Sequence, residues 1–377
     1  MPRRVLFLVN HRPDRSPGQR FRFEQYLPYL EKHGFECHLS PLLRDRYEDE
    51  VFYSRGRYVG KARIFLNSVR LRTRDWLRLD DYDIVFIYRE ALMTRHTMFE
   101  RLFRQAGPRI IFDFDDAIWL PAVSPENQAL RWLKDPGKTR RLLSWSDMVF
   151  AGNRYLADYA SRFCDTVRIV PTTVDTAVFR PREPDGFADG VVEIGWTGSP
   201  STIEHLRFRL PALRRLREKY GSRVRFKVIG DGRFRDEALG IVGLPWRRET
   251  ELIDLSTMDI GIMPLPDDEW TRGKCGFKGL TYMALGIPAM LSPVGVNTDI
   301  VQDDVNGMLA GSEDEWVDKL SLLIERPDVR RRLGTAGRET VVAHYSVCSQ
   351  RDKYVEYFNE VLALPRRARR ARPSVGE

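Results

Sequence analysis

The feature that most constrains this chain is a rhythm in which short apolar runs alternate with helical patterns. Val5–Val9 is a run of five apolar residues that is typical of a buried strand. A polar loop at 10–19 follows, and then a helical pattern with Phe23, Tyr26 and Leu30 on one face. Further strand-like runs lie at 83–88, 109–112, 148–151 and 167–170. A strand-then-helix rhythm predicts a mostly parallel, doubly wound sheet.

The rhythm stops at 179–190, which is rich in Pro, Gly and charge, and this stretch is typical of a linker. It then restarts, with strands expected at 191–196, 224–229, 260–263 and 289–291, and helices at 203–220, 277–285, 313–324 and 349–364. We therefore predict an α/β fold with two Rossmann-like domains that face each other across a central cleft. The ligand is expected outside the carboxyl ends of the strands.

The predicted domains are 1–178 and 191–346, and the chain ends in a basic tail at 365–377 that we expect to be disordered. The net charge of +8 indicates an anionic partner without naming it. The four cysteines are far apart and form no CxxC pair, which fits a reducing cytoplasm. Because no window of 18 residues is uninterruptedly apolar, we expect no transmembrane helix.

Residues 54–78 carry eight Arg or Lys residues and one acid, interleaved with apolar side chains. Such a basic amphipathic helix can lie on an anionic membrane, in this case on the inner face, and the Arg-rich tail would add to the attraction. It can equally be a solvated helix that packs on its own domain. Nucleic acid is not favoured as a partner, because no helix-turn-helix, RNP or zinc-finger pattern accompanies the charge.

A short polar segment at 271–276 opens one of the expected helices. Lys274 and Lys278 are four residues apart and can lie on one face of this helix entrance. Together with the N–H groups of a helix start, they would form an anion site that suits a diphosphate. The alternative is two surface lysines on an ordinary helix N-terminus.

The run from Gly273 to Ala310 resembles the donor-site block of glycosyltransferase family 4. The matching motifs are Tyr-Met-Ala-Leu-Gly-Ile-Pro at 282–288, Ser-Pro-Val-Gly at 292–295 and Asn306-Gly307. Weaker matches lie at 171–179, 226–232 and 337–346. The resemblance implies a GT-B fold and a retaining transfer of sugar from a nucleoside-diphosphate donor, with no metal or other cofactor. It also implies that the last helix packs back on the N-terminal domain.

Two departures from the family pattern affect the predicted donor site. Gly273 and Thr281 occupy the positions of the paired glutamates, so Thr281 would offer a hydroxyl to the ribose and Gly273 only backbone to the sugar. The first loop of the second domain has no cation before Arg207. We therefore expect Lys274 and Lys278 to supply the charge, with the remaining donor contacts drawn from Thr197, Gly198, Ser199, Gly230, Trp246, Gly276 and Phe277. Trp246 would stack on the base, unless it is a core residue.

In the first domain, the resemblance implies a flexible loop that contains Gly18 and Arg20, with Arg22 and His11 nearby. Gly18 would permit close approach, and Arg20 or Arg22 would neutralise the leaving diphosphate. The alternative is a basic surface loop.

Asp115 and Asp116 follow a strand, and they can orient the acceptor, accept its proton, or cap a helix. Tyr88-Arg89-Glu90 ends a neighbouring strand and can reach the same place, whereas His205 reads as an ordinary helix residue. We give a metal at these acids a low rank, because enzymes of the GT-B type generally work without one.

The prediction is a glycosyltransferase that acts on a hydroxyl of a glycan, lipid-linked or small-molecule acceptor. Because both family glutamates are missing, a catalytically inactive nucleotide-sugar or glycan-binding relative in a polysaccharide assembly complex stays open. A nicotinamide-dependent oxidoreductase is disfavoured, since neither half has G-x-G-x-x-G after its first strand.

Overall fold

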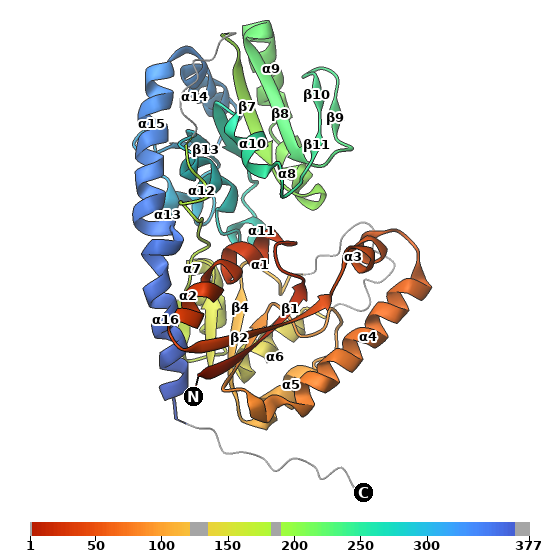
Figure 1. The fold of residues 1–377 in the computed structure, drawn as a ribbon. Helices are drawn as coiled ribbons and strands as arrows, with labels where there is room; N and C mark the ends of the chain where they lie inside the picture. The colour runs from red at the N-terminus through yellow and green to blue at the C-terminus, as the bar shows by residue number, and fades with distance from the viewer. Residues whose placement is uncertain (1, 121–134, 182–189, 366–377) are drawn as a thin grey trace, which may run out of the picture. The chain divides into compact units, whose positions relative to one another are not determined.

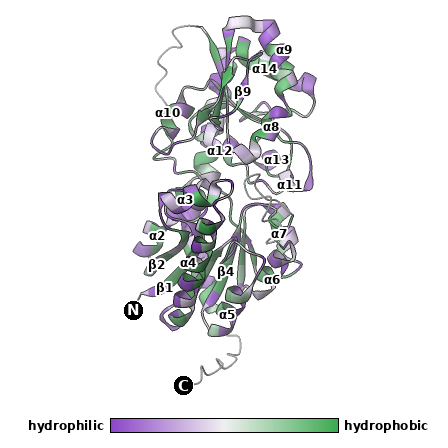
Figure 2. Ribbon diagram, turned by 90° about the vertical axis from the view of Figure 1, so that its right-hand side faces the viewer, coloured by the Kyte–Doolittle hydropathy of each residue, from purple (hydrophilic) through white to green (hydrophobic). Residues whose placement is uncertain are grey.

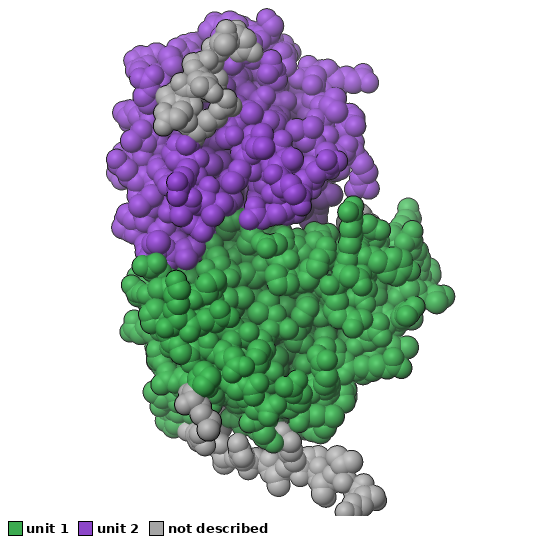
Figure 3. Space-filling model, in the orientation of Figure 1, with its two compact units in different colours: residues 1–171, 351–377 green, residues 172–350 purple. Residues whose placement is uncertain are grey.

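The computed structural model describes residues 2–120, 135–181 and 190–365, so the tail from 366 onwards lies outside the described residues. The chain forms two compact units, which are coloured separately in Figure 3. Unit 1 comprises residues 1–171 and 351–377, and unit 2 comprises residues 172–350. No described helix is both long enough and apolar enough to cross a bilayer.

Unit 1 is built on a parallel sheet with the strand order β2-β1-β3-β4-β5-β6. Its strands are β1 Arg3–His11, β2 Phe35–Leu43, β3 Ile84–Tyr88, β4 Arg109–Phe114, β5 Met148–Ala151 and β6 Val167–Ile169. Its helices are α1 Pro17–Arg22, α2 Leu27–Lys32, α3 Arg46–Tyr53, α4 Tyr58–Leu77, α5 Met98–Ala106, α6 Gly137–Trp145 and α7 Arg154–Ala160. The helices α4, α5 and α6 cover one face of the sheet (Figure 1).

The opposite face of this sheet is packed with aromatic side chains, and the last helix, α16 Val347–Ala363, lies against it. Phe358 of α16 stacks on Phe7 of β1 and Phe86 of β3, with ring centroids 6.3 and 6.1 Å apart. Tyr354 stacks on Tyr26 at 4.3 Å. Aromatic pairs at these spacings add to the stabilisation that burial gives, so α16 contributes to the core of unit 1.

Two local features of unit 1 differ from the sequence prediction. The polar loop expected at 10–19 is shorter, because β1 runs to His11 and α1 begins at Pro17. Proline is favoured at the first turn of a helix, where its missing N–H costs nothing, so Gly18 and Arg20 lie in a helix rather than in a flexible loop. Strand β2 was not predicted, since it contains Pro41 and polar residues; it is an edge strand, where proline is tolerated.

Unit 2 is built on a second parallel sheet, with the order β11-β8-β7-β12-β13-β14. Its strands are β7 Val192–Thr197, β8 Val224–Gly230, β11 Leu244–Pro245, β12 Ile260–Met263, β13 Ala289–Leu291 and β14 Met308–Leu309, and β9 Arg235–Asp236 pairs with β10 Ile241–Val242. Its helices are α8 Ile203–Arg207, α9 Leu210–Tyr220, α10 Glu251–Ser256, α11 Glu269–Arg272, α12 Phe277–Ala284, α13 Asn297–Ile300, α14 Glu313–Glu325 and α15 Pro327–Thr340.

The central strands β12 and β13 of unit 2 are apolar and buried at every position, and hydrophobic residues gather in the interior of the unit (Figure 2). This is the pattern of a parallel sheet that helices cover on both sides. The helix expected at 203–220 is divided into α8 and α9, because Pro211 stands in the first turn of α9 and starts a new helix there.

A buried ion pair holds α1 against the sheet of unit 1. The guanidinium of Arg22 donates to both carboxylate oxygens of Asp113 on β4 and to the carbonyl of Val170. Both side chains are almost fully buried. Burial raises the pKa of Asp113, and the Arg22 guanidinium opposes that rise. Arg22 is therefore a structural residue and not a diphosphate ligand, as one reading of the sequence had it.

We expect Arg22→Met to destabilise unit 1 by about 3–5 kcal/mol, because it leaves the Asp113 carboxylate buried without its cation. Urea denaturation followed by circular dichroism measures this change. The double variant R22M/D113L should recover most of the loss. The control R154M, which breaks an exposed pair with Asp158, should cost no more than about 1 kcal/mol. Equal effects of R22M and R154M would contradict the assignment.

Candidate functional site

The predicted donor residues of unit 2 collect at the carboxyl ends of its parallel strands. Thr197 ends β7 and Gly230 ends β8, and the register pairs Thr197 with Ile229. The two strand ends approach so closely that a Cβ on Gly230 would lie 1.5 Å from the carbonyl oxygen of Gly198. Gly230 also has a φ of +122°, which side chains rarely adopt. Glycine is therefore required at Gly230 for the backbone to take this path.

The backbone donors of the Gly198 turn are already engaged within unit 2. The N–H of Thr197 donates to the Tyr282 hydroxyl, and the N–H of Gly198 donates to the carbonyl of Ile229, both at 2.9 Å. The N–H of Ser199 donates to the Thr202 hydroxyl at 3.1 Å, in a capping box. The prediction that the Gly198 N–H binds phosphate is wrong, because this N–H is bonded to the neighbouring strand. The exposed hydroxyl of Ser199 is the polar group that the turn presents to solvent.

Tyr282 links the helix of the Tyr-Met-Ala motif to two strand ends. Its ring is fully buried against β12, where a Cβ on Gly261 would lie 2.2 Å from the ring. Its hydroxyl accepts from Thr197 of β7 and lies 3.3 Å from the carbonyl oxygen of Ile262. The motif therefore fixes the position of α12 relative to the β7 turn.

The structure brings Lys274 and Lys278 to this same place. Lys278, in the first turn of α12, has its Nζ 5.6 Å from the ring centroid of Trp196, and the edge of that ring faces Gly198. Lys274 lies between α11 and α12, with its Nζ 4.7 Å from the centroid of Trp270. Both cations thus lie over aromatic rings, an arrangement that holds a charged side chain in place.

His205 of α8 joins this group, although its sequence context predicted an ordinary helix residue. Burial, and then the charges of Lys278 and Lys274, lower the pKa of His205 to about 4. Its Nδ1 is buried and has no hydrogen-bond partner among the described residues. His205 is therefore a neutral imidazole beside two cations at neutral pH. The one signal in the sequence was its place on the first helix after β7.

The start of α12 is shaped by glycines. Gly276 has a φ of +68°, and a Cβ there would lie 2.2 Å from Cδ1 of Ile300. The Oδ1 of Asn297, whose side chain is fully buried, has no hydrogen-bond partner in the described part of the chain and lies near Gly276. Gly273 caps the end of α11 through its N–H to the Trp270 carbonyl, and Phe277 is half-buried at the first position of α12.

Thr281 and Trp246 differ in how far they can serve a nucleotide. The Thr281 side chain is 1% exposed, and its hydroxyl donates to the carbonyl of Phe277 at 2.8 Å. This placement argues against the expected ribose contact, because the hydroxyl proton is used within the helix. Trp246 is half-exposed directly after β11, where Pro245 pairs with Gly230. Its indole N–H donates to Glu251 at 3.1 Å, and this bond fixes the orientation of the ring, on which a nucleotide base could stack.

The predicted residues of unit 1 also lie at strand ends. Asp115 follows β4, accepts from Arg89 at 2.7 Å and lies 3.1 Å from the Tyr88 hydroxyl. A Cβ on Gly18 would lie 2.2 Å from that hydroxyl, so α1 closes over this pair. Arg89 adopts a φ of +63°, which is uncommon for a residue with a side chain. Asp116 lies 4.0 Å from Arg89, whereas Glu90 pairs with Lys138 instead.

These contacts change the interpretation of Asp115. Burial disfavours its charged form, but Arg89, Arg22 and the hydrogen bonds from Arg89 and Tyr88 outweigh this and lower its pKa. A carboxylate with a lowered pKa is a poor proton acceptor at neutral pH. Of the roles that the sequence left open for Asp115, proton acceptance is therefore disfavoured, whereas acceptor orientation and a structural role stay open.

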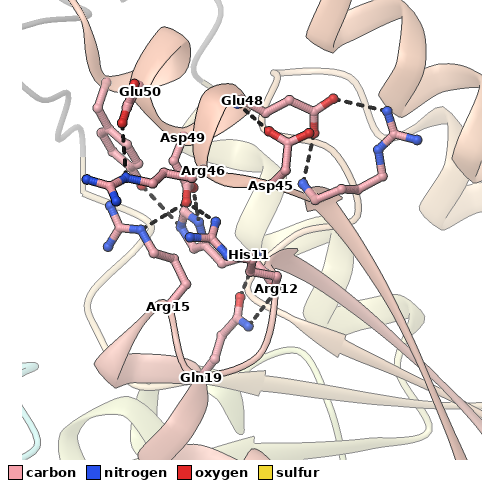
Figure 4. A network of polar contacts seen from close by, with 11 residues as sticks. His11, Arg12, Arg15, Gln19, Asp45, Arg46, Glu48, Asp49 and Glu50 are labelled. Carbon is pink, nitrogen blue, oxygen red and sulfur yellow. Dashed lines mark hydrogen bonds and ion pairs between the residues drawn. The ribbon is translucent and has the colours of Figure 1, made fainter. Parts of the chain in front are cut away.

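His11 lies in a separate polar network at the end of β1, which Figure 4 shows. Its Nδ1 is 3.4 Å from Asp49 of α3, and its Nε2 is 3.1 Å from the Tyr53 hydroxyl. Arg12 and Arg15 also donate to Asp49. Burial would raise the pKa of Asp49, but the contacts from His11, Arg12 and Arg15 lower it. Arg20 is largely buried, with its guanidinium 4.2 Å from the Phe21 ring centroid.

Among the residues that the structure describes, no three His, Cys, Asp or Glu side chains are grouped as ligands for a metal ion. Asp113, Asp115 and Asp116 are held by Arg22 and Arg89.

The comparisons with known proteins fit this geometry. Residues 191–326 match the family described as Glycosyl transferases group 1, and no curated protein matches the chain. The chain is similar to the structure of a sucrose-phosphate synthase from Thermosynechococcus elongatus, with a TM-score of 0.70 and 14% identity over 97% of this chain and 100% of that one.

Two further structures are similar. A glycosyltransferase from Rickettsia africae has a TM-score of 0.65 and 13% identity, over 97% of this chain and 100% of that one. HepE from Anabaena, in complex with UDP-glucose, has a TM-score of 0.65 and 11% identity, over 95% of this chain and 99% of that one. These likenesses confirm that the fold is GT-B, with two parallel six-stranded sheets. The residues that match Glycosyl transferases group 1 all lie in unit 2, as do Lys274 and Lys278.

We expect the neutral His205 to make the protein sensitive to acid. The pKa is about 4 in the folded state and 6.5 ordinarily, so the unfolded chain binds a proton between these values and the folded chain does not. Stability is therefore lost as pH falls from about 6.5 to about 4. The variant H205Q should show a smaller drop in Tm between pH 7 and pH 4.5 than the wild type.

The matched control is H344Q, because His344 is exposed. It should keep the drop in Tm that the wild type shows. An H205Q variant whose Tm falls as steeply as that of the wild type would show that His205 is not held neutral.

Proposed function

We propose that the protein is a family 4 glycosyltransferase that transfers a sugar, with retention, from a nucleoside-diphosphate donor to a hydroxyl of a glycan, lipid-linked or small-molecule acceptor. The observation that supports it is the placement of Lys274 and Lys278 beside the β7 turn, within the segment that matches Glycosyl transferases group 1. The four cysteines are free thiols, which fits the reducing cytoplasm as the place of action.

The chemistry that these residues serve is the departure of the diphosphate. The bond between the sugar C1 and the β-phosphate oxygen breaks, the acceptor oxygen forms a bond to C1, and the acceptor proton passes to the departing diphosphate. Negative charge develops on the leaving diphosphate, and two fixed cations with the positive end of α12 stabilise it. Trp246 would stack on the base, near the end of β8. The reaction needs no metal in this proposal.

We expect the variant K274A/K278A to lower donor turnover by at least about 100-fold, since the loss of one charge-stabilising donor often costs that much. Turnover is measured by mass spectrometry with a panel of UDP-, GDP-, ADP- and dTDP-sugars, with and without a mixed set of sugar acceptors. The control K32A/K353A removes two exposed lysines of unit 1 and should keep wild-type turnover. Near-wild-type turnover in K274A/K278A would contradict the assignment.

A second candidate is a non-catalytic nucleotide-sugar or glycan-binding relative in a polysaccharide assembly complex. Two observations favour it: Gly273 has no side chain where the resemblance places a glutamate, and Thr281 turns its hydroxyl into its own helix. Binding of a nucleotide sugar in calorimetry, with neither transfer nor donor hydrolysis across the panel, would support this candidate over the enzyme.

A further inference from the structure

Helix α4 of unit 1 has two faces of opposite character. The inner face carries Ile64, Ser68, Arg72 and Asp75, which are all buried. Arg72 donates to Asp75 at 2.9 Å and to the carbonyl of Ala91 at 2.7 Å. The only acid of α4 is thus buried and already paired with a cation of the same helix. The helix is anchored on its own domain through this face.

The opposite side is exposed, and we call it the α4 outer face. It consists of residues at helical spacing along the whole helix: Val59, Arg63, Leu66, Arg70, Arg74 and Leu77. Val59 is 87% exposed, Leu66 55% and Leu77 61%. Because Asp75 is buried, this face combines three cations with three aliphatic side chains and has no carboxylate. Figure 2 shows the mixture of hydrophilic and hydrophobic residues along α4.

The segment before α4 continues this composition. Arg55 and Arg57 are exposed, and so are the aromatic rings of Tyr53, the last residue of α3, at 42%, and Tyr58, the first residue of α4, at 61%. Amphipathic rings are favoured at the boundary between water and lipid. The α4 outer face therefore has cations and aliphatic chains along its length, and two exposed aromatic rings lie next to its N-terminal end.

The composition selects among possible partners. A solvated helix does not require exposed aliphatic residues at regular spacing. A nucleic acid binds through its phosphates, so a surface that binds it requires cations but not aliphatic residues. An anionic bilayer uses both, since its headgroups attract the arginines and its acyl boundary takes up the apolar chains. We propose that the α4 outer face docks unit 1 on an anionic lipid bilayer.

This proposal does not depend on the proposed function, and it is tested without a nucleotide or an acceptor. The full-length protein is sedimented with vesicles of phosphatidylcholine alone and of phosphatidylcholine with phosphatidylglycerol. It should bind the anionic vesicles and not the zwitterionic ones. R63E/R70E/R74E should weaken vesicle binding by at least about 100-fold, from a contribution of about 1 kcal/mol for each arginine near the surface.

Two further variants separate docking from general attraction by a basic protein. V59S/L66S leaves the charge unchanged and should weaken binding about tenfold, because two apolar chains no longer leave water. R162E/R223E/R331E changes three exposed arginines elsewhere and should bind as the wild type does. Circular dichroism confirms that each variant is folded.

The proposal is overturned by any of three results. The protein does not bind anionic vesicles, or V59S/L66S binds them as tightly as the wild type, or the distant arginine variant loses as much as R63E/R70E/R74E. Tighter binding to a single-stranded RNA than to vesicles, with the same loss in R63E/R70E/R74E, would instead make the face a nucleic-acid surface.

Discussion

The parallel pairing of β7 with both β8 and β12 is the constraint on which the candidate donor site depends. It brings Thr197, Gly230 and Met263 to the same edge of the sheet. The close approach of Gly198 and Gly230 then leaves no room for a side chain between the strands. Tyr282 ties α12 to this edge through its hydroxyl. Lys278, in the first turn of α12, then lies over Trp196 of β7, and Lys274, just before α12, lies over Trp270.

In the proposed function, the donor site of unit 2 stabilises charge rather than transferring protons. In unit 2 the cations lie over Trp196 and Trp270, and His205 stays neutral beside them. In unit 1 the carboxylates Asp113 and Asp115 are held by Arg22 and Arg89. A transfer in which the leaving diphosphate carries the developing charge has most need of cations and little need of a strong base. The chemistry proposed for this chain is of that kind.

The fold was largely predictable, and the reason lies in the strands. The runs at 260–263 and 289–291 are apolar on both faces and bounded by polar or proline-rich segments, so their extents were predicted to the residue. The edge strand β2 was not predicted, because Pro41 and its polar residues interrupt the apolar pattern that identifies a strand. The helix at 203–220 was predicted as one, although Pro211 divides it.

The site was predictable in its residues more than in its contacts. Spacing placed Lys274 and Lys278 at one helix entrance, but it could not show that sheet pairing uses the Gly198 N–H or that Thr281 faces its own helix. His205 was missed for the same reason, since its neighbours come from segments about 70 residues away in the chain. Local patterns define strands and helices, whereas side-chain partners depend on tertiary packing.

The most direct test of the central claim is lysine labelling with and without a nucleoside diphosphate. The folded protein reacts with an acetylating reagent, and mass spectrometry gives the rate at each lysine. The account predicts that a nucleoside diphosphate that raises Tm also slows the labelling of Lys274 and Lys278, while Lys32 and Lys353 react as before. If the diphosphate binds and both Lys274 and Lys278 remain as reactive as in its absence, the donor site lies elsewhere.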